Sequence, residues 1–180
     1  MSKFNQIMVD IETMGTKSFS SLTSIGAVEF NLETGEVGET FLINIDLKSS
    51  VDCGLIIDPN TVMWWLSQDK ESQNRLMVDC KSLPQSLAEF RSFFIGREGY
   101  NVWGNSARFD MGLLENAYNT IGEKIPWSYR NERCVRTLSG MFPDIKEGVK
   151  FTGIKHDALD DCLHQIKYCH ETYKKLKTSI

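Results

Sequence analysis

The first third of the chain alternates apolar and polar residues in the manner of β-strands. Residues 5–12, 22–31 and 38–46 carry this pattern, and a fourth, shorter apolar segment lies at 100–104. A turn sequence at 33–36 separates the second segment from the third, which predicts a hairpin. We therefore expect a sheet that begins antiparallel.

Helical spacing dominates the rest of the chain. Asp58 followed by Pro59 marks the start of a helix over 61–66, and Ser82 with Gln85 predicts a capping box ahead of residues 87–94. A further helix is predicted from Phe109 until Gly122 ends it. In the last predicted helix six apolar residues share one face: Leu159, Cys162, Ile166, Cys169, Tyr173 and Leu176. The order of elements predicts an α/β fold with a mixed sheet flanked by helices.

Length and composition indicate one soluble globular domain over residues 1–180. Apolar residues make up 41% and charged residues 24% of the 180 positions. No apolar run reaches the roughly 18 residues that a membrane span needs, and the N-terminus lacks the features of a signal peptide. Five cysteines without close pairing argue against a disulfide framework or a zinc site. We expect a cytoplasmic protein that does not bind membranes.

The net charge of −4 restricts the ways in which this chain could bind nucleic acid. Proteins that coat long stretches of nucleic acid are usually basic, so this balance argues against a histone-like or repressor-like binder. It is compatible with an enzyme that holds only a few terminal phosphates through metal ions.

Three groups of residues could carry chemistry. Asp10 and Glu12 are two positions apart on a predicted strand, so both carboxylates point to one face, where a divalent cation is the usual compensation for their repulsion. Asp110 lies at the start of the helix predicted after the fourth strand. His156 lies just before the last helix, and Asp161 lies in its second turn at the edge of the apolar face. Each group alone has an ordinary structural interpretation, such as a helix-start aspartate favoured by the dipole.

Taken in chain order, the three groups resemble the DnaQ-like exonucleases of the ribonuclease H-like fold, in the subgroup named for four acidic residues and a histidine (DEDDh). The resemblance runs from about Gln6 to about Leu176. Closer similarity to the nuclease domain of bacterial exonuclease VIII, and to small phage and mycobacterial exoribonucleases, lies in five segments: residues 10–15, 61–66, 102–105, 135–137 and 156–161. Those relatives tend to have an acidic residue where this chain has Cys134, which leaves the salt-bridge partner of Arg136 open.

The resemblance implies a three-layer fold and a metal-dependent 3′→5′ exonuclease that releases nucleoside monophosphates. Two Mg²⁺ or Mn²⁺ ions would activate the attacking water and stabilise the leaving oxygen. Asp10 would bridge both ions, while Glu12 and Asp161 would hold the ion that carries the water. Asp110 would act at the second ion, and His156 would be the general base.

Residues near the catalytic pair are expected to contact the terminal nucleotide. In relatives the segment that corresponds to Thr13, Met14 and Gly15 contacts the terminal sugar and base. Trp64 and Trp65 point about 100° apart on a helix, so only one can face the nucleotide. We assign Trp64 to base stacking and Trp65 to the core, because aromatic stacking is common in single-strand sites.

The sequence does not decide the roles of two further residues, the type of nucleic acid or the oligomeric state. Asn105 and Arg136 could either reach a phosphate or brace the acidic site. The expected partner is a single-stranded 3′ end, and the sequence does not separate RNA from DNA, because that choice rests on one or two contacts to the 2′-hydroxyl. The alternatives are an inactive or accessory nucleic-acid-binding module and an exonuclease acting on duplex DNA ends. Homo-oligomer formation is left open.

Overall fold

The computed structural model describes residues 3–179, so residues 1, 2 and 180 of the predicted domain lie outside the described part. Its five strands form a single sheet in the order β3-β2-β1-β4-β5. The pairs β1–β2 and β2–β3 are antiparallel, whereas β1–β4 and β4–β5 are parallel, which confirms the predicted mixed sheet. The strands are β1 (Gln6–Thr13), β2 (Leu22–Phe30), β3 (Val37–Asn44), β4 (Asn101–Gly104) and β5 (Glu132–Cys134).

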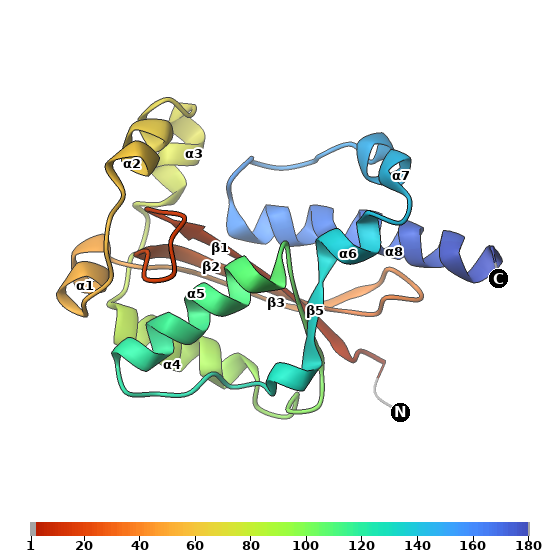
Figure 1. Ribbon diagram of the computed structural model, residues 1–180, viewed down its shortest axis with the longest axis horizontal. Coiled ribbons are helices and arrows are strands. Elements are labelled where there is room, and N and C mark those ends of the chain that lie inside the picture. The colour runs from red at the N-terminus through yellow and green to blue at the C-terminus, as the bar shows by residue number, and fades with distance from the viewer. Residues whose placement is uncertain (1–2, 180) are drawn as a thin grey trace.

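Helices cover both faces of this sheet, which gives three layers. Figure 1 shows α4 and α5 on one side and α8 on the other, with α2 and α3 beside the end at which α8 begins. Within residues 3–179, no helix combines the length and the apolar character needed to cross a membrane. The helices are α1 (Leu47–Asp52), α2 (Pro59–Leu66), α3 (Lys70–Arg75), α4 (Leu83–Phe93), α5 (Ala107–Thr120), the 3₁₀ helix η1 (Tyr129–Asn131), α6 (Val135–Ser139), α7 (Pro143–Gly148) and α8 (Ala158–Thr178).

Strand β1 separates two apolar cores because its side chains alternate between the faces of the sheet. Ile7, Val9 and Ile11 belong to the core that contains the buried residues of α4 and α5. Met8 belongs to the second core, with the buried residues of α8. By the same alternation Asp10 and Glu12 lie on the α8 face, so the carboxylates of β1 point toward the last helix.

The predicted capping box at the start of α4 is wrong. Ser82 is the N-cap residue, but its side chain makes no capping hydrogen bond. The Gln85 amide donates instead to Glu89 at 3.0 Å, and the backbone N–H of Leu83 donates to the Ser49 hydroxyl at 2.9 Å. A hydroxyl from another helix thus satisfies the first N–H of α4, and the Ser82 side chain caps none of the remaining N–H groups of the first turn.

Two other features depart from the sequence analysis. Strand β5 was not predicted, because three half-buried residues carry too little pattern to identify a strand. On α8, Gln165 and Tyr168 are buried, whereas Tyr173 and Leu176 of the predicted apolar face are only partly buried. The Tyr173 hydroxyl lies 3.4 Å from Glu33 in the turn after β2, so the end of the helix packs over that turn.

Gly26 lets α8 approach the sheet closely. A Cβ atom at this position would lie 2.4 Å from both the carbonyl carbon and the carbonyl oxygen of Ala158, at the first turn of α8. Gly26 is also the residue of β2 that pairs with Asp10 of β1. The start of α8 therefore packs directly against the sheet beside β1.

We expect Gly26→Ala to lower the free energy of unfolding by about 1–3 kcal/mol, because the added methyl group meets backbone atoms that cannot rotate away. Denaturant unfolding measures the effect. The control is Gly112→Ala within α5, where an added Cβ meets nothing within 4 Å and should stabilise the helix by up to about 1 kcal/mol. An unchanged unfolding midpoint for Gly26→Ala would contradict the close packing of α8.

Candidate active site

The first pair of acidic residues lies at the carboxyl end of β1. Asp10 and Glu12 share the face that α8 covers, and the Gln165 amide on α8 donates to Asp10 Oδ1 at 2.7 Å. Glu12 is buried, with 8% of its surface exposed. Strand alternation therefore brings the two carboxylates together, and a polar residue of α8 orients one of them.

The other two acidic residues come from the starts of two helices. Asp110 lies in the first turn of α5, directly after β4, and it is buried with Oδ2 lacking any hydrogen-bond partner among residues 3–179. Asp161 lies in the first turn of α8, one turn earlier than expected, because Asp157 caps the helix through its side chain. Glu12, Asp161 and His156 each place a ligand atom within 4.8 Å of the others.

Burial and mutual repulsion disfavour the charged forms of these acids. Burial, together with the carboxylates of Asp110 and Asp161, raises the pKa of Asp10 well above its usual range. Burial and the charge of Asp10 do the same to the pKa of Glu12. Burial raises the pKa of Asp110 to about 7 and that of Asp161 to about 6.

A cluster of this kind needs protons or a cation to offset its charge. Hard divalent ions such as Mg²⁺ and Mn²⁺ prefer carboxylate oxygens. The unpartnered oxygen of Asp110 and the short separation of the Glu12 and Asp161 ligand atoms fit that donor set. The residues present can therefore hold the divalent ions that the sequence analysis expects.

A short tether from α3 fixes the loop that carries His156. His156 has a backbone φ of 61°, which non-glycine residues rarely adopt. The Ser72 hydroxyl donates to the Lys155 carbonyl at 2.8 Å, and the Arg75 guanidinium lies 3.4 Å from the Asp157 carboxylate. Both neighbours of His156 are thus held from α3. Sequence reasoning missed this tether, because no local pattern links segments about 80 residues apart.

The two adjacent tryptophans have different surroundings. Trp65 is 4% exposed, and its indole N–H donates to the Thr13 carbonyl at 3.0 Å. Trp64 is 43% exposed, and its ring centre lies 4.9 Å from that of His156 in an edge-on arrangement. Trp65 therefore connects α2 to the catalytic strand, whereas Trp64 offers an accessible aromatic surface beside the histidine.

A hollow of about 450 Å³ opens beside Glu12. It contains most of the residues predicted to contact the terminal nucleotide, together with six that were not predicted to do so. The predicted ones are Thr13, Gly15, Trp64 and Trp65, and the additional ones are Ile11, Thr16, Asp58, Asn60, Thr61 and Phe109. The additional residues come from the end of β1 and the loop after it, the start of α2 and the start of α5, whose proximity only the tertiary fold reveals.

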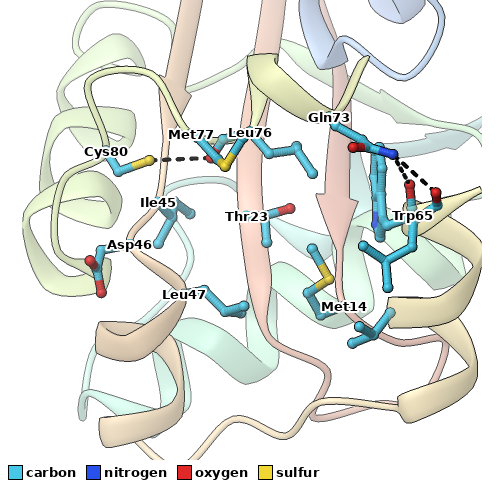
Figure 2. Close-up of a pocket in the computed structure, with 12 residues that line it drawn as sticks. Met14, Thr23, Ile45, Asp46, Leu47, Trp65, Gln73, Leu76, Met77 and Cys80 are labelled. Atoms are coloured by element: carbon cyan, nitrogen blue, oxygen red, sulfur yellow. Dashed lines mark hydrogen bonds between the residues drawn. The ribbon is translucent and has the colours of Figure 1, made fainter. Parts of the chain in front are cut away.

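Met14 does not line this hollow. Its side chain points into a separate apolar cavity of about 490 Å³, which Figure 2 shows between Trp65, Thr23 and Leu76. The Gln73 amide closes one side of that cavity by donating to the carbonyls of Trp65 and Leu66 at 3.1 Å each. Trp65 forms a wall of both spaces, so the apolar cavity lies on the opposite side of the tryptophan from the hollow beside Glu12.

Asn105 and Arg136 contact each other. The Arg136 guanidinium donates to the Asn105 side-chain oxygen at 3.3 Å and to its backbone carbonyl at 3.2 Å. Arg136 thus has Asn105 as its hydrogen-bond partner, and its positive charge also opposes the rise in the pKa of Asp110. Neither residue lines the hollow beside Glu12.

We expect Asp10→Asn to stabilise the metal-free protein, because the variant keeps an oxygen acceptor for Gln165 but removes one of the clustered charges. In chelator its melting temperature should rise by about 2–4 °C for about 1 kcal/mol of relieved repulsion. Thermal unfolding with and without Mn²⁺ measures this, and the stabilisation by Mn²⁺ should be lost. Glu115→Gln, an exposed site on α5, controls for net charge. A variant that melts below the parent in chelator would contradict the repulsion.

Solved structures that resemble this chain are exonucleases. A full-length 3′-exonuclease has a TM-score of 0.64 at 15% identity, with 97% of this chain and 84% of that chain covered. The nuclease domain of 3′hExo, a DEDDh family member bound to rAMP, has a TM-score of 0.66 at 14% identity, with 97% and 94% covered. E. coli exonuclease I with a dT13 oligonucleotide has a TM-score of 0.67 at 16% identity, with 96% and 42% covered. These similarities show a shared fold.

A family model provides the more specific match. No curated protein matches the chain. The model of the 3′-5′ exoribonuclease Rv2179c-like domain matches residues 5–173, which include all four acidic residues and His156. The chain therefore belongs to the Rv2179c-like family of 3′-5′ exoribonuclease domains and is a 3′-5′ exonuclease.

Proposed function

We propose that this exonuclease hydrolyses single-stranded 3′ ends one nucleotide at a time, with two divalent cations and His156 as general base. The observation that carries the proposal is the convergence of four acidic side chains and a histidine beside a hollow that is open to solvent. RNA is the first substrate to test, because the matching family is described as exoribonuclease.

The chain's acidic residues would hold the cations and orient the scissile phosphate. When bound, the cations activate the attacking water and stabilise the leaving oxygen. The carboxylates of both Asp110 and Asp161 raise the pKa of Asp10, so Asp10 lies near both, and it would hold the cations together with them. Glu12 and Asp161 lie on the side of His156, and Asp110 lies at the start of α5.

His156 is suited to accept the proton of the attacking water. Partial burial and the nearby charge of Lys155 lower its pKa below the ordinary value, which favours the neutral imidazole, the form with a free lone pair. The Trp64 ring and the tether from α3 limit its movement. A fixed, neutral imidazole beside Glu12 and Asp161 is the arrangement that a general base requires.

The hollow beside Glu12 supports recognition of a terminal nucleotide. Trp64 offers an accessible aromatic ring for a base, and stacking of this kind tolerates every base. Asp58, Asn60 and Thr61 add polar groups that could meet the 2′- and 3′-hydroxyls of a terminal ribose. Similar structures include a 3′-exonuclease that recognises the 3′ end of a histone mRNA stem-loop and an exonuclease I bound to single-stranded DNA.

A digestion panel tests the polarity and the substrate. With Mg²⁺ or Mn²⁺, RNA labelled at its 5′ end should give a ladder of successively shorter strands, and excess chelator should abolish it. The panel includes DNA, duplexes, circular single strands and strands blocked at either end. A 3′ block should stop digestion, whereas a 5′ block should not.

Each alternative has its own outcome in that panel. Release of the 5′ label as the first mononucleotide, or cleavage of circles, would contradict 3′→5′ exonuclease action. Digestion confined to duplex DNA would favour the alternative of duplex ends. Tight binding of strands without hydrolysis under any metal condition would favour a nucleic-acid-binding module.

We expect His156→Ala to slow the chemical step by about 10²–10⁴-fold while metal affinity changes little, because the residue accepts a proton instead of holding an ion. Single-turnover kinetics gives the rate and titration calorimetry with Mn²⁺ gives the affinity. His170→Ala on the far half of α8 is the matched control, since that ring contacts the Leu32 carbonyl away from the acidic cluster. An equal loss of Mn²⁺ affinity and rate in His156→Ala would make the histidine a metal ligand.

A further inference from the structure

A second polar hollow lies next to the one beside Glu12. Its volume is about 670 Å³, and its walls come from the loop after β1, the first three turns of α5 and the start of α6. The Asn116 amide of α5 donates to the Ser18 carbonyl of the loop at 2.6 Å, which ties two of these walls together. The residues that line it are Thr16, Lys17, Ser18, Ser106, Arg108, Phe109, Gly112, Leu113, Asn116 and Arg136.

The two hollows adjoin each other. Thr16 and Phe109 line both of them, so the Phe109 ring lies at the boundary between the space beside Glu12 and the second hollow. Phe109 directly precedes Asp110, whose carboxylate belongs to the acidic cluster. A strand whose last nucleotide occupies the first hollow would therefore enter the second hollow with the nucleotides that precede it.

The charge of the second hollow is opposite to that of the catalytic cluster. Lys17, Arg108 and Arg136 line it, and no acidic residue is among the described residues of its walls. Lys17 and Arg108 are exposed, and within residues 3–179 neither side chain takes part in a hydrogen bond or an ion pair. Arg136 is held in place by its two bonds to Asn105.

Three cations gather in this hollow although the chain as a whole is acidic, with a net charge of −4. Several other lysines and arginines, such as Lys81, Arg91 and Arg97, pair with glutamates. Lys17 and Arg108, which have no carboxylate partner among residues 3–179, are available for anions, and phosphodiesters are the anions that a nucleic-acid strand presents in series.

We propose that this second hollow, named here the upstream groove, binds the phosphates that lie 5′ of the scissile bond in a single-stranded RNA. Lys17 and Arg108 would contact these phosphates as mobile cations, while Arg136 forms a fixed wall. Phe109 would separate the terminal nucleotide from its neighbour. The proposal rests on the proposed exonuclease function. It assigns a binding site to the part of the substrate that the acidic cluster and His156 do not reach.

Substrate length tests the upstream groove. Diadenylate contains only the scissile phosphate, whereas pentaadenylate adds three upstream phosphates. We expect the double variant Lys17→Ala/Arg108→Ala to lose about tenfold in kcat/KM on the pentamer and to change much less on the dimer. The preference of the enzyme for the longer substrate should fall accordingly.

Salt dependence provides a second, independent measurement. The slope of log(kcat/KM) against log[KCl] on the pentamer should become shallower by about 1.4 when two phosphate contacts are lost, since each contributes about 0.7 on a single strand. The matched control is Lys124→Ala/Lys175→Ala, which removes the same net charge at two exposed sites outside both hollows. This control should keep the length preference and the slope of the parent enzyme.

The outcomes separate the groove from the underlying function. An unchanged length preference and salt slope in Lys17→Ala/Arg108→Ala would overturn the groove. An equal loss on dimer and pentamer would also overturn it, because the two residues would then act on the catalytic cluster. Failure of the parent enzyme to hydrolyse either substrate with Mg²⁺ or Mn²⁺ would instead contradict the proposed exonuclease function.

Discussion

Repulsion between four carboxylates in a partly buried space is the constraint on which the arrangement of this protein depends. Asp10, Glu12, Asp110 and Asp161 come from a strand and two helix starts, and burial raises the pKa of each. Such a cluster destabilises the fold unless protons or cations offset it. The surrounding structure must therefore hold the acids in place against their own repulsion, and it does so through the packing of α8 on β2, the amide of Gln165 and the tether from α3.

These supports also explain why the histidine is so closely held. The first turn of α8 lies on the backbone of Gly26, which fixes Asp161 relative to Asp10 in the neighbouring strand. Just before this helix, Ser72 and Arg75 hold the residues on both sides of His156. The proposed role of His156 as a general base would depend on such secondary contacts, because a mobile loop would reduce the fraction of productive geometries.

The sequence predicted the parts of the structure that depend on local periodicity. Strand alternation placed Asp10 and Glu12 on one face, and the order of elements predicted the mixed sheet. It could not predict the tether from α3, the position of Phe109 between the two hollows, or the wall formed by Lys17 and Arg108. These features depend on segments that meet only in the folded chain. The capping box at Ser82 was also wrong, because the Gln85 amide donates to Glu89 instead of to the N-cap residue, and Ser49 of another helix accepts from the first N–H of α4.

Opposite charges on adjoining surfaces allow an acidic protein to handle a polyanion. The acidic cluster would repel a phosphate backbone without its cations, so metal loading and strand binding at that point are coupled. Lys17 and Arg108 lie beyond Phe109, outside this cluster, and can attract the strand whether or not the cations are bound. Attraction by only a few cations is weak and sensitive to salt, which permits release after each cleavage. A short basic surface beside the acidic cluster would thus reconcile a net charge of −4 with the proposed removal of nucleotides one at a time.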